Sequence, residues 1–228
     1  MPSNSDIRAR TGGRESDRRQ TDSRPPRLGV LISGRGSNLQ SIIDAIGEGR
    51  LDAMIGVVIS NRSDAAGLTR ARHAGLDTRW LAPRDDVDRD VYDRALVEIL
   101  RAQQIDLVCL AGFMRLVTAP LLDAFPNRVL NIHPSLLPAF PGLDAQEQAL
   151  LHGVRISGAT VHLVTPELDN GPIILQAAVP VVDDDTLETL SARILTEEHR
   201  IYPEAIRLVL EGNWSIAGRR FRLNDRQP

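Results

Sequence analysis

Short apolar runs that alternate with helix-period segments constrain the fold of this chain more than any other feature. From Arg27 onward, the runs "RLGVLIS", "AMIGVVIS", "TRWLA", "DLVCLAG" and "RVLNIH" have the length and apolarity of buried strands. Segments with the apolar spacing of helices separate the first four, at about 38–46, 64–74 and 87–102. This β-α-β order predicts an α/β fold with a Rossmann-like, mostly parallel sheet and helices on both faces.

The last third of the chain has a different pattern. After a further helix from about Ala145, "GATVHLVTP" and "PIILQAAVPVV" read as a strand pair joined by the turn-rich "ELDNG". A long C-terminal helix is predicted over Thr186–Glu211. We expect one globular domain over residues 27–228, since the chain is long enough to bury a sizeable core.

The first 26 residues have the composition of a disordered tail. They contain six arginines against four acidic residues and almost nothing apolar, so they cannot offset the entropy lost on ordering. We therefore expect residues 1–26 to form a disordered, arginine-rich tail.

The absence of lysine and the presence of a single cysteine exclude several kinds of chemistry. All 27 basic residues are arginine, which excludes a lysine Schiff base, a pyridoxal-phosphate anchor and the lysine of a P-loop. The single cysteine, Cys109, lies in a predicted buried strand, so neither a disulfide nor a cysteine-rich metal site is expected. This cysteine usage fits a reducing cytoplasm, where we expect the protein to act.

Charge and hydropathy narrow the class of partner. No apolar run approaches the length that a membrane span needs. The formal net charge of −3 argues against a broad basic face for nucleic acid. We expect small-molecule partners, with neither nucleic acid nor a membrane among them.

A glycine-rich turn follows the first predicted strand. In "ISGRGSNLQ", Gly34 and Gly36 flank Arg35, and a helix begins near Ser37. Glycines permit a tight turn, and the free N–H groups of a helix start form a cradle for an anion such as phosphate. The dinucleotide fingerprint fails because Leu39 stands where its third glycine belongs. A plain strand-to-helix turn is the alternative interpretation.

A second candidate lies at the end of the fifth predicted strand, in "LNIHPSLLPAFPG". Strand alternation points Asn131 and His133 to one side of the sheet and Ile132 toward the core. The Asn131 amide and a protonated His133 could each donate a hydrogen bond to the oxyanion of an attacked carbonyl. A structural role for His133 is the competing interpretation.

Two further loops complete the candidate site. Asp169 lies in the turn of "TPELDNGPIILQ"; if the fold brings it beside His133, its charge would raise the pKa of that imidazole and prepare an acid. Ordinary turn chemistry is the alternative for Asp169. In "LAGFMRLV", Gly112, Phe113 and Met114 leave a strand end and either line an apolar slot or pack in the core.

The other histidines, at positions 73, 152, 162 and 199, fall in ordinary strand and helix contexts. The sequence has no H-E-x-x-H spacing and no G-x-S-x-G, so we expect neither a metal site nor a serine nucleophile. The remaining chemistry is acyl transfer in which the substrate supplies the nucleophile.

The segments "LISGRGSNLQ", "ISNR", "LAGFMRLV", "LNIHPSLLPAFPG", "GATVHLV" and "ELDNGPIILQ" occur in this order. Together they resemble the phosphoribosylglycinamide formyltransferases, folate-dependent enzymes of purine biosynthesis, from about Leu28 to Gly212. The resemblance implies a formyltransferase domain over 27–228. It would transfer a formyl group from the co-substrate 10-formyltetrahydrofolate to the amine of N1-(5-phospho-D-ribosyl)glycinamide, giving the N2-formyl product and tetrahydrofolate on the route to IMP.

The resemblance also implies roles for individual residues. The catalytic positions are Asn131, His133 and Asp169, the substrate phosphate lies on Gly36, Ser37 and Asn38, and Glu198 meets the ribonucleotide. The folate contacts are Arg89, Met114, Arg115, Leu116, Val117, Asn131, Thr165, Pro166, Glu167, Leu168 and Asp169. Some relatives carry Gln in place of Leu195 and His in place of Asp144, so no substrate contact is carried over to these two positions.

Three alternatives stand beside this interpretation. A formyltetrahydrofolate hydrolase shares the catalytic trio but usually has an additional N-terminal domain. A nicotinamide reductase would use the Gly34–Gly36 turn, with Arg62 on a 2′-phosphate. A binding protein could hold folate or nucleotide on the same fold. The sequence leaves a homodimer open.

Overall fold

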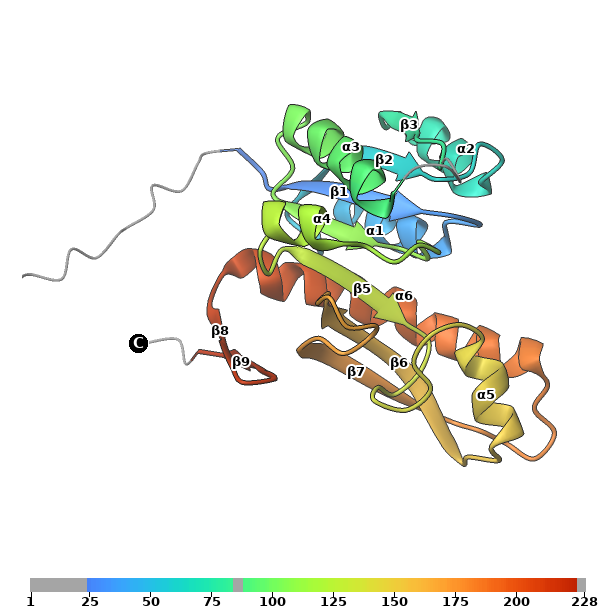
Figure 1. Cartoon of the computed structure of the whole chain (residues 1–228). Helices are drawn as coiled ribbons and strands as arrows, with labels where there is room; N and C mark the ends of the chain where they lie inside the picture. Colours follow the sequence, from blue (N-terminus) through green and yellow to red (C-terminus); the bar gives the residue numbers. More distant parts are fainter. Residues whose placement is uncertain (1–23, 84–87, 225–228) are drawn as a thin grey trace, which may run out of the picture.

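The computed structural model describes residues 24–83 and 88–224, which form a single nine-stranded sheet (Figure 1). The strand order is β3-β2-β1-β4-β5-β6-β7-β9-β8. The strands are β1 (Arg27–Ile32), β2 (Met54–Ser60), β3 (Thr78–Trp80), β4 (Leu107–Leu110), β5 (Val129–His133), β6 (Ile156–Leu163), β7 (Ile173–Pro180), β8 (Trp214–Ala217) and β9 (Arg220–Leu223).

The first five strands in this order are parallel, from β3 through β1 to β5. Strand β6 then pairs antiparallel with β5, and β7 pairs antiparallel with β6. The order reverses between β1 and β4, because the chain runs outward to β3 before it returns. This switch point is where open α/β sheets bind ligands.

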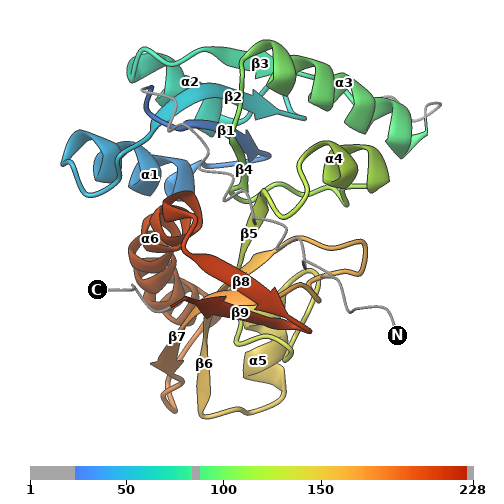
Figure 2. The ribbon, with the colours of Figure 1, turned by 90° about the vertical axis from the view of Figure 1, so that its left-hand side faces the viewer.

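The helices cover both faces of the sheet, as the sequence predicts (Figure 2). They are α1 (Ser37–Gly47), α2 (Ala66–His73), α3 (Arg89–Ala102), α4 (Ala119–Ala124), α5 (Ala145–Leu151) and α6 (Leu187–Glu211). Helices α1, α2, α5 and α6 contribute to one apolar cluster, whereas α3 and α4 pack into a second cluster on the opposite face. The predicted mostly parallel sheet, C-terminal strand pair and long C-terminal helix are all confirmed.

Helix α6 begins where its sequence predicts, because Thr186 caps it. The Thr186 hydroxyl accepts from the Thr189 N–H, and the Thr189 hydroxyl accepts from the Thr186 N–H, a reciprocal pair that satisfies free donors at a helix start. Helix α4 and the β8–β9 hairpin were not predicted. The hairpin is held by stacking of Trp214 on Phe221, with ring centroids 5.0 Å apart.

A buried tyrosine connects α6 to the centre of the sheet. Tyr202 is fully buried, and its hydroxyl donates to the carbonyl oxygens of Leu110 at 3.0 Å and Leu130 at 3.4 Å. The nearby Cys109 thiol is also fully buried, which raises its pKa to about 12. Cys109 therefore lies in a buried strand, as the sequence predicts, and Tyr202 anchors α6 to β4 and β5.

Most of the predicted N-terminal tail, residues 1–23, lies outside the described residues, as does Val87 at the predicted start of α3. The last residues of that tail contact the domain. The Arg24 guanidinium lies 2.8 Å from the Asp106 carboxylate, and the Pro26 carbonyl accepts from the Met54 N–H at 2.8 Å. The segment that leads into β1 is therefore held beside the starts of β2 and β4.

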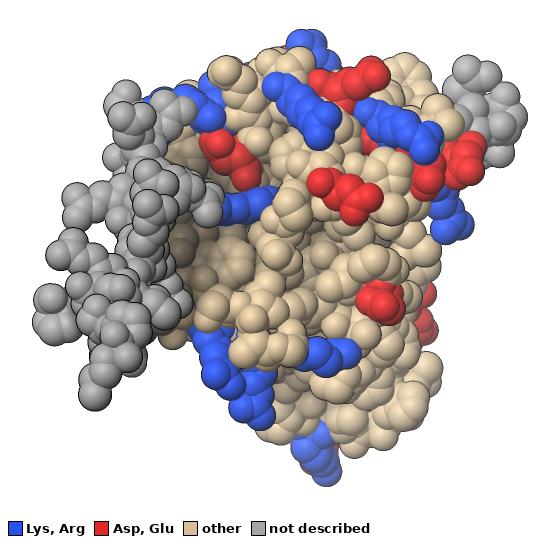
Figure 3. All heavy atoms as spheres, turned by 60° about the vertical axis from the view of Figure 1, so that its left-hand side comes forward, with Lys and Arg blue, Asp and Glu red and all other residues tan. Residues whose placement is uncertain are grey.

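Acidic and basic side chains are interspersed over the upper part of the face shown in Figure 3. None of the helices in residues 24–83 and 88–224 combines the length and apolarity needed to cross a bilayer.

Candidate active site

A polar patch is built into the sheet where β5 meets β6. The antiparallel register pairs Asn131 with His162 and His133 with Thr160. Because side chains alternate along a strand, these four residues share the face opposite α6, whereas Ile132 enters the α6 core. The predicted orientation of Asn131, Ile132 and His133 is therefore confirmed.

Asp169 reaches this patch from the loop between β6 and β7. Its backbone is left-handed, with φ of 46°, a conformation that aspartate tolerates better than most residues. One carboxylate oxygen, Oδ2, lies 3.4 Å from His133 Nδ1 and accepts from the Gly142 N–H at 2.8 Å. The other, Oδ1, lies 3.5 Å from the Asn131 amide nitrogen. The fold thus brings the three predicted catalytic residues together.

The hydrogen bonds of His133 fix the roles of its two ring nitrogens. Nε2 lies 2.8 Å from the Phe140 carbonyl oxygen; a carbonyl can only accept, so Nε2 carries a proton. In the neutral ring Nδ1 then carries a lone pair, which faces Asp169. Nδ1 is therefore the nitrogen that gains a proton when the ring becomes charged. Phe140 presents its carbonyl from a left-handed conformation with φ of 53°, which is strained for a bulky residue.

The sequence predicts that Asp169 raises the His133 pKa, but the overall shift of this pKa is downward. His133 is only 4% exposed, and burial, the largest effect, lowers its pKa below the ordinary histidine value. The Phe140 carbonyl and the Asp169 charge raise the pKa, as expected for Asp169, while His162 lowers it. Desolvation of the cation outweighs the attraction, so the imidazolium is not prepared in advance.

Asp169 itself stays ionised. Burial raises the pKa of its carboxyl, but contacts with His162, the Gly142 N–H and His133 outweigh that effect and lower the pKa overall. A carboxylate surrounded by donors favours its charged form. The patch therefore holds a fixed negative charge beside an imidazole that can gain a proton.

His162, for which the sequence predicts only an ordinary strand position, belongs to the same cluster. It is 2% exposed, with Nε2 lying 3.2 Å from the Asn131 amide nitrogen and 3.6 Å from Asp169 Oδ1. Its Nδ1 donates to the Leu163 carbonyl at 2.9 Å, so the neutral ring accepts from Asn131 through Nε2. Alternation along β6 could have placed His162 on this face, but only the β5–β6 register puts it opposite Asn131.

The predicted phosphate loop lies between β1 and α1. Gly36 is the N-terminal cap residue of α1 and has φ of 72°, and a Cβ at this position would lie 2.6 Å from the Gly67 Cα. Glycine is therefore required at position 36, both for its conformation and for its approach to α2. The first N–H groups of α1 lack intrahelical partners and are suited to hold an anion.

A buried carboxylate lies next to this loop. Glu198 of α6 is 6% exposed and accepts from the Asn38 amide at 2.8 Å. Burial raises the pKa of Glu198, opposed by the Asn38 hydrogen bond and the Arg35 charge. Asn38 Oδ1 is buried with no hydrogen-bond partner among the described residues, so this corner is suited to receive a donor group from a ligand.

Most of the residues expected to contact the folate lie on two loops, one after β4 and one after β6. Met114 and Leu116 are 65% and 50% exposed on the loop after β4, and Leu168 is 52% exposed beside Asp169. Val117 and Val164 both pack against the apolar cluster that contains α3 and α4, so the loops after β4 and β6 lie on the same face of the sheet. Thr165, Pro166 and Glu167 lie in the β6 loop.

Arg89 and Arg115, the two arginines among the expected folate contacts, differ in their own partners. The Arg115 guanidinium stacks over the Tyr92 ring, 4.3 Å from its centroid. Arg89 is exposed at the start of α3. Within the described ranges, no hydrogen bond or ion pair joins Arg89 to the cluster or to these loops, so its role as a folate contact stays a prediction.

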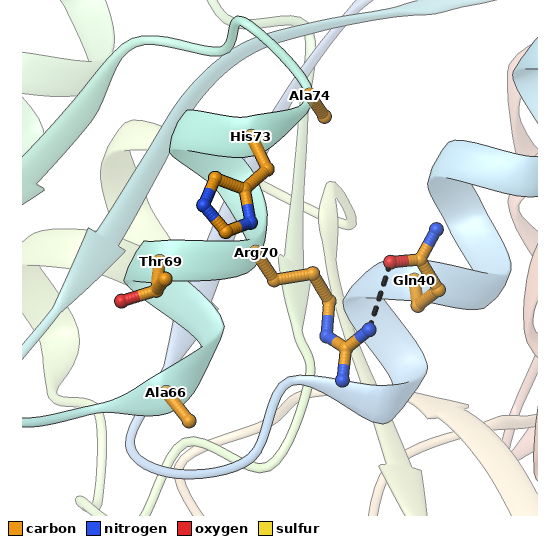
Figure 4. A pocket seen from close by; sticks show the side chains of 6 residues that line it. All are labelled: Gln40, Ala66, Thr69, Arg70, His73 and Ala74. Carbon is orange, nitrogen blue, oxygen red and sulfur yellow. Dashed lines mark hydrogen bonds between the residues drawn. The ribbon is translucent and has the colours of Figure 1, made fainter.

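A hollow of about 450 Å³ lies elsewhere, between α1 and α2 (Figure 4). Arg70 crosses it and donates to Gln40 at 3.0 Å. None of the catalytic candidates lines it. This bond links α2 to α1. In residues 24–83 and 88–224, no group of three or more His, Cys, Asp or Glu side chains is arranged to hold a metal ion.

Comparison with known proteins identifies relatives. A family model described as formyl transferase matches residues 26–206. Phosphoribosylglycinamide formyltransferase of Escherichia coli (strain K12) is 47% identical over 183 residues, which cover 80% of this chain and 86% of that protein. A crystal structure of glycinamide ribonucleotide transformylase 1 from Symbiobacterium toebii is 62% identical with a TM-score of 0.86, covering 88% of this chain and 95% of that one.

A larger relative contains a similar segment. The human trifunctional purine biosynthetic protein adenosine-3 is 48% identical over 186 residues, which cover 82% of this chain. The matched region spans only 18% of that protein's length.

The geometry of the phosphate loop predicts a difference between its two glycines. Gly36→Ala should lower the free energy of unfolding by roughly 1–3 kcal/mol, because it forces a left-handed backbone and a clash with Gly67. Gly34→Ala is the matched control, since a Cβ there meets nothing within 4 Å. Urea unfolding of both variants measures the difference. Equal stabilities would contradict the proposed packing of Gly36.

The hydrogen-bonded cluster predicts the titration of His133. NMR should give a His133 pKa below the ordinary value of 6.5, and Asp169→Asn should lower it further by removing an attractive charge. As the pH falls, His133 then becomes protonated in the unfolded chain at a higher pH than in the folded chain, which favours unfolding. Wild type should therefore lose stability below pH 6.5 relative to His133→Gln. A His133 pKa above 6.5 would instead mean that the Asp169 charge outweighs burial.

Proposed function

This chain belongs to the formyl transferase family and is a formyltransferase; from that premise we propose that it formylates the amine of N1-(5-phospho-D-ribosyl)glycinamide with 10-formyltetrahydrofolate in purine biosynthesis. The observation that carries the proposal is the cluster of Asn131, His133 and Asp169. The Asp169 carboxylate lies 3.4 Å from His133 Nδ1 and 3.5 Å from the Asn131 amide nitrogen. The cluster offers donors to an oxyanion and supplies no nucleophile, as expected when the substrate amine attacks.

The ribonucleotide occupies the α1 side of the site in this proposal. Its phosphate binds the N–H groups of Gly36, Ser37 and Asn38, where the helix start attracts negative charge. Glu198 and the unpaired Asn38 Oδ1 accept from the rest of the substrate. The folate lies against Met114–Val117 and Thr165–Asp169, whose exposed apolar side chains favour a flat ring.

The formyl carbon is attacked directly. The amine nitrogen forms a bond to this carbon, the carbonyl electron pair moves to oxygen, and collapse of the adduct breaks the bond to the folate nitrogen. The proton lost by the amine is delivered to the leaving folate nitrogen, with Asp169 as its carrier. No covalent enzyme intermediate forms.

His133 changes its partner during the reaction. In the free chain its Nε2–H donates to the Phe140 carbonyl at 2.8 Å, and we infer that the formyl oxygen takes that place. The developing oxyanion then raises the His133 pKa, so the proton that the amine gives to Asp169 is held on Nδ1, which faces Asp169. This proton returns through Asp169 to the leaving folate nitrogen when the adduct collapses. The Asn131 amide supplies the second donor by exchanging its 3.5 Å contact with Asp169 Oδ1 for the oxyanion. The imidazolium thus forms with the oxyanion instead of preceding it.

The test of this function is release of tetrahydrofolate from the formyl donor, with and without the ribonucleotide. Wild type should release it only when the amine is present and should yield the N-formyl product. Formate release without the amine would favour the hydrolase alternative, and binding without any product would favour a binding protein.

Single substitutions test the two oxyanion donors. Asn131→Ala and His133→Ala should each lower turnover by about 10²–10³ with folding intact, because each removes one donor. His73→Ala, which removes an exposed histidine on α2, is the matched control and should retain wild-type turnover. Near-normal turnover in Asn131→Ala or His133→Ala would refute the assignment.

The trifunctional activities of the larger relatives are not assigned to this chain. A reducing cytoplasm as the place of action, and a homodimer as the assembly, stay predictions from the sequence.

A further inference from the structure

Ser33 connects the phosphate loop to the loop after β4. It follows β1, is 6% exposed, and its N–H donates to the Gly112 carbonyl at 3.0 Å. Its hydroxyl accepts from the Met114 N–H at 2.7 Å and donates to Asn61 Oδ1 at 2.6 Å. This residue at the end of β1 therefore joins the segments that follow β2 and β4.

The hydroxyl can serve both partners only in one orientation. A serine hydroxyl has a single proton and two lone pairs, and the proton is committed to the amide oxygen of Asn61. A lone pair is then left for the Met114 N–H. Asn61 thereby orients Ser33, and Ser33 fixes the backbone of Met114.

The phosphate loop is rigid on the other side of Ser33. The next residue, Gly34, accepts through its carbonyl from the Gly67 N–H at 3.0 Å. Gly36 lies against the Gly67 backbone, too close for a side chain. A shift of this turn therefore moves Ser33 rather than being absorbed within the loop.

Hydrogen bonds hold both ends of the loop after β4, and only those at one end lead to the phosphate loop. At its far end, the Thr118 N–H and hydroxyl both donate to Asp93, at 2.6 and 3.0 Å. Asp93 belongs to α3 and is 2% exposed. Between these ends, Met114 and Leu116 are exposed. Ser33 is thus the anchor that leads to the phosphate loop, and the Thr118–Asp93 anchor does not.

We propose that Ser33 is a positioning residue that couples occupation of the phosphate loop to the affinity of the β4 loop for folate. The inference rests on the proposed function, which places phosphate on Gly36–Asn38 and folate on Met114–Val117. An anion on the α1 N–H groups shifts this turn as a unit, and Ser33 carries the shift to the Met114 amide that it binds. Both loops border the switch point between β1 and β4.

The experiment measures the affinity of 5,8-dideazafolate, a stable analogue without a formyl group, by calorimetry with and without saturating ribose 5-phosphate. Ribose 5-phosphate carries the phosphate but no amine, so the coupling is read without reaction. In wild type, ribose 5-phosphate should tighten folate binding by about fivefold or more, within the usual range of coupling between sites. By linkage, the folate analogue should tighten ribose 5-phosphate binding by the same factor.

Two variants separate coupling from loop stability. Ser33→Ala should reduce the coupling factor to about 1, because it removes the acceptor of the Met114 N–H. Thr118→Val, the matched control, removes one bond of the Thr118–Asp93 anchor and should weaken folate binding with and without ribose 5-phosphate by the same factor. Its coupling factor should equal that of wild type. Urea unfolding shows that both variants are folded.

The outcomes separate the role of Ser33 from the proposed function. If Ser33→Ala keeps the wild-type coupling factor, if Thr118→Val loses it equally, or if wild type binds both probes without coupling, the role of Ser33 is overturned while the proposed function stands. If wild type binds neither probe, the proposed function fails first.

Discussion

The Asp169 carboxylate is the interaction on which the candidate site depends. Its two oxygens face His133, Asn131 and His162 and accept from the Gly142 N–H. Those partners come from β5, β6 and the loop after β5, so one charge joins three separate segments. Without it, the Asn131 amide and the Gly142 N–H would lose their shared acceptor, and a proton on His133 Nδ1 would have no opposite charge beside it. The same charge opposes the desolvation that keeps His133 neutral in the free chain.

The sheet makes this arrangement possible by separating polar from apolar side chains. The face of β5 and β6 toward α6 carries Leu130, Ile132 and Val161, all in the core, while the opposite face carries the polar cluster. Helix α6 supports both functions, because Tyr202 holds the strands and Glu198 reaches the phosphate loop. Asn131, His133 and His162 therefore lie on rigid strands, whereas Asp169 comes from a loop, and the loops also supply shape and apolar contact.

The sequence predicted most of the fold because its strands are continuous apolar runs and its helices have clear periodicity and caps, as at Thr186. It also predicted that Asn131 and His133 share a face, since alternation is local. It missed α4, which is only six residues long, and the β8–β9 hairpin, which rests on Trp214 and Phe221. His162 was missed because its position depends on a register between strands, and the lowered His133 pKa because burial depends on the whole fold.

The central claim is that the Asp169 charge drives formyl transfer through His133. The most direct measurement is the single-turnover rate of formyl transfer by Asp169→Asn, which keeps the shape of the side chain but removes its charge. The account predicts that this rate falls by about 10²–10³ or more, while the affinity for the ribonucleotide stays close to wild type. A single-turnover rate near that of wild type would contradict the account.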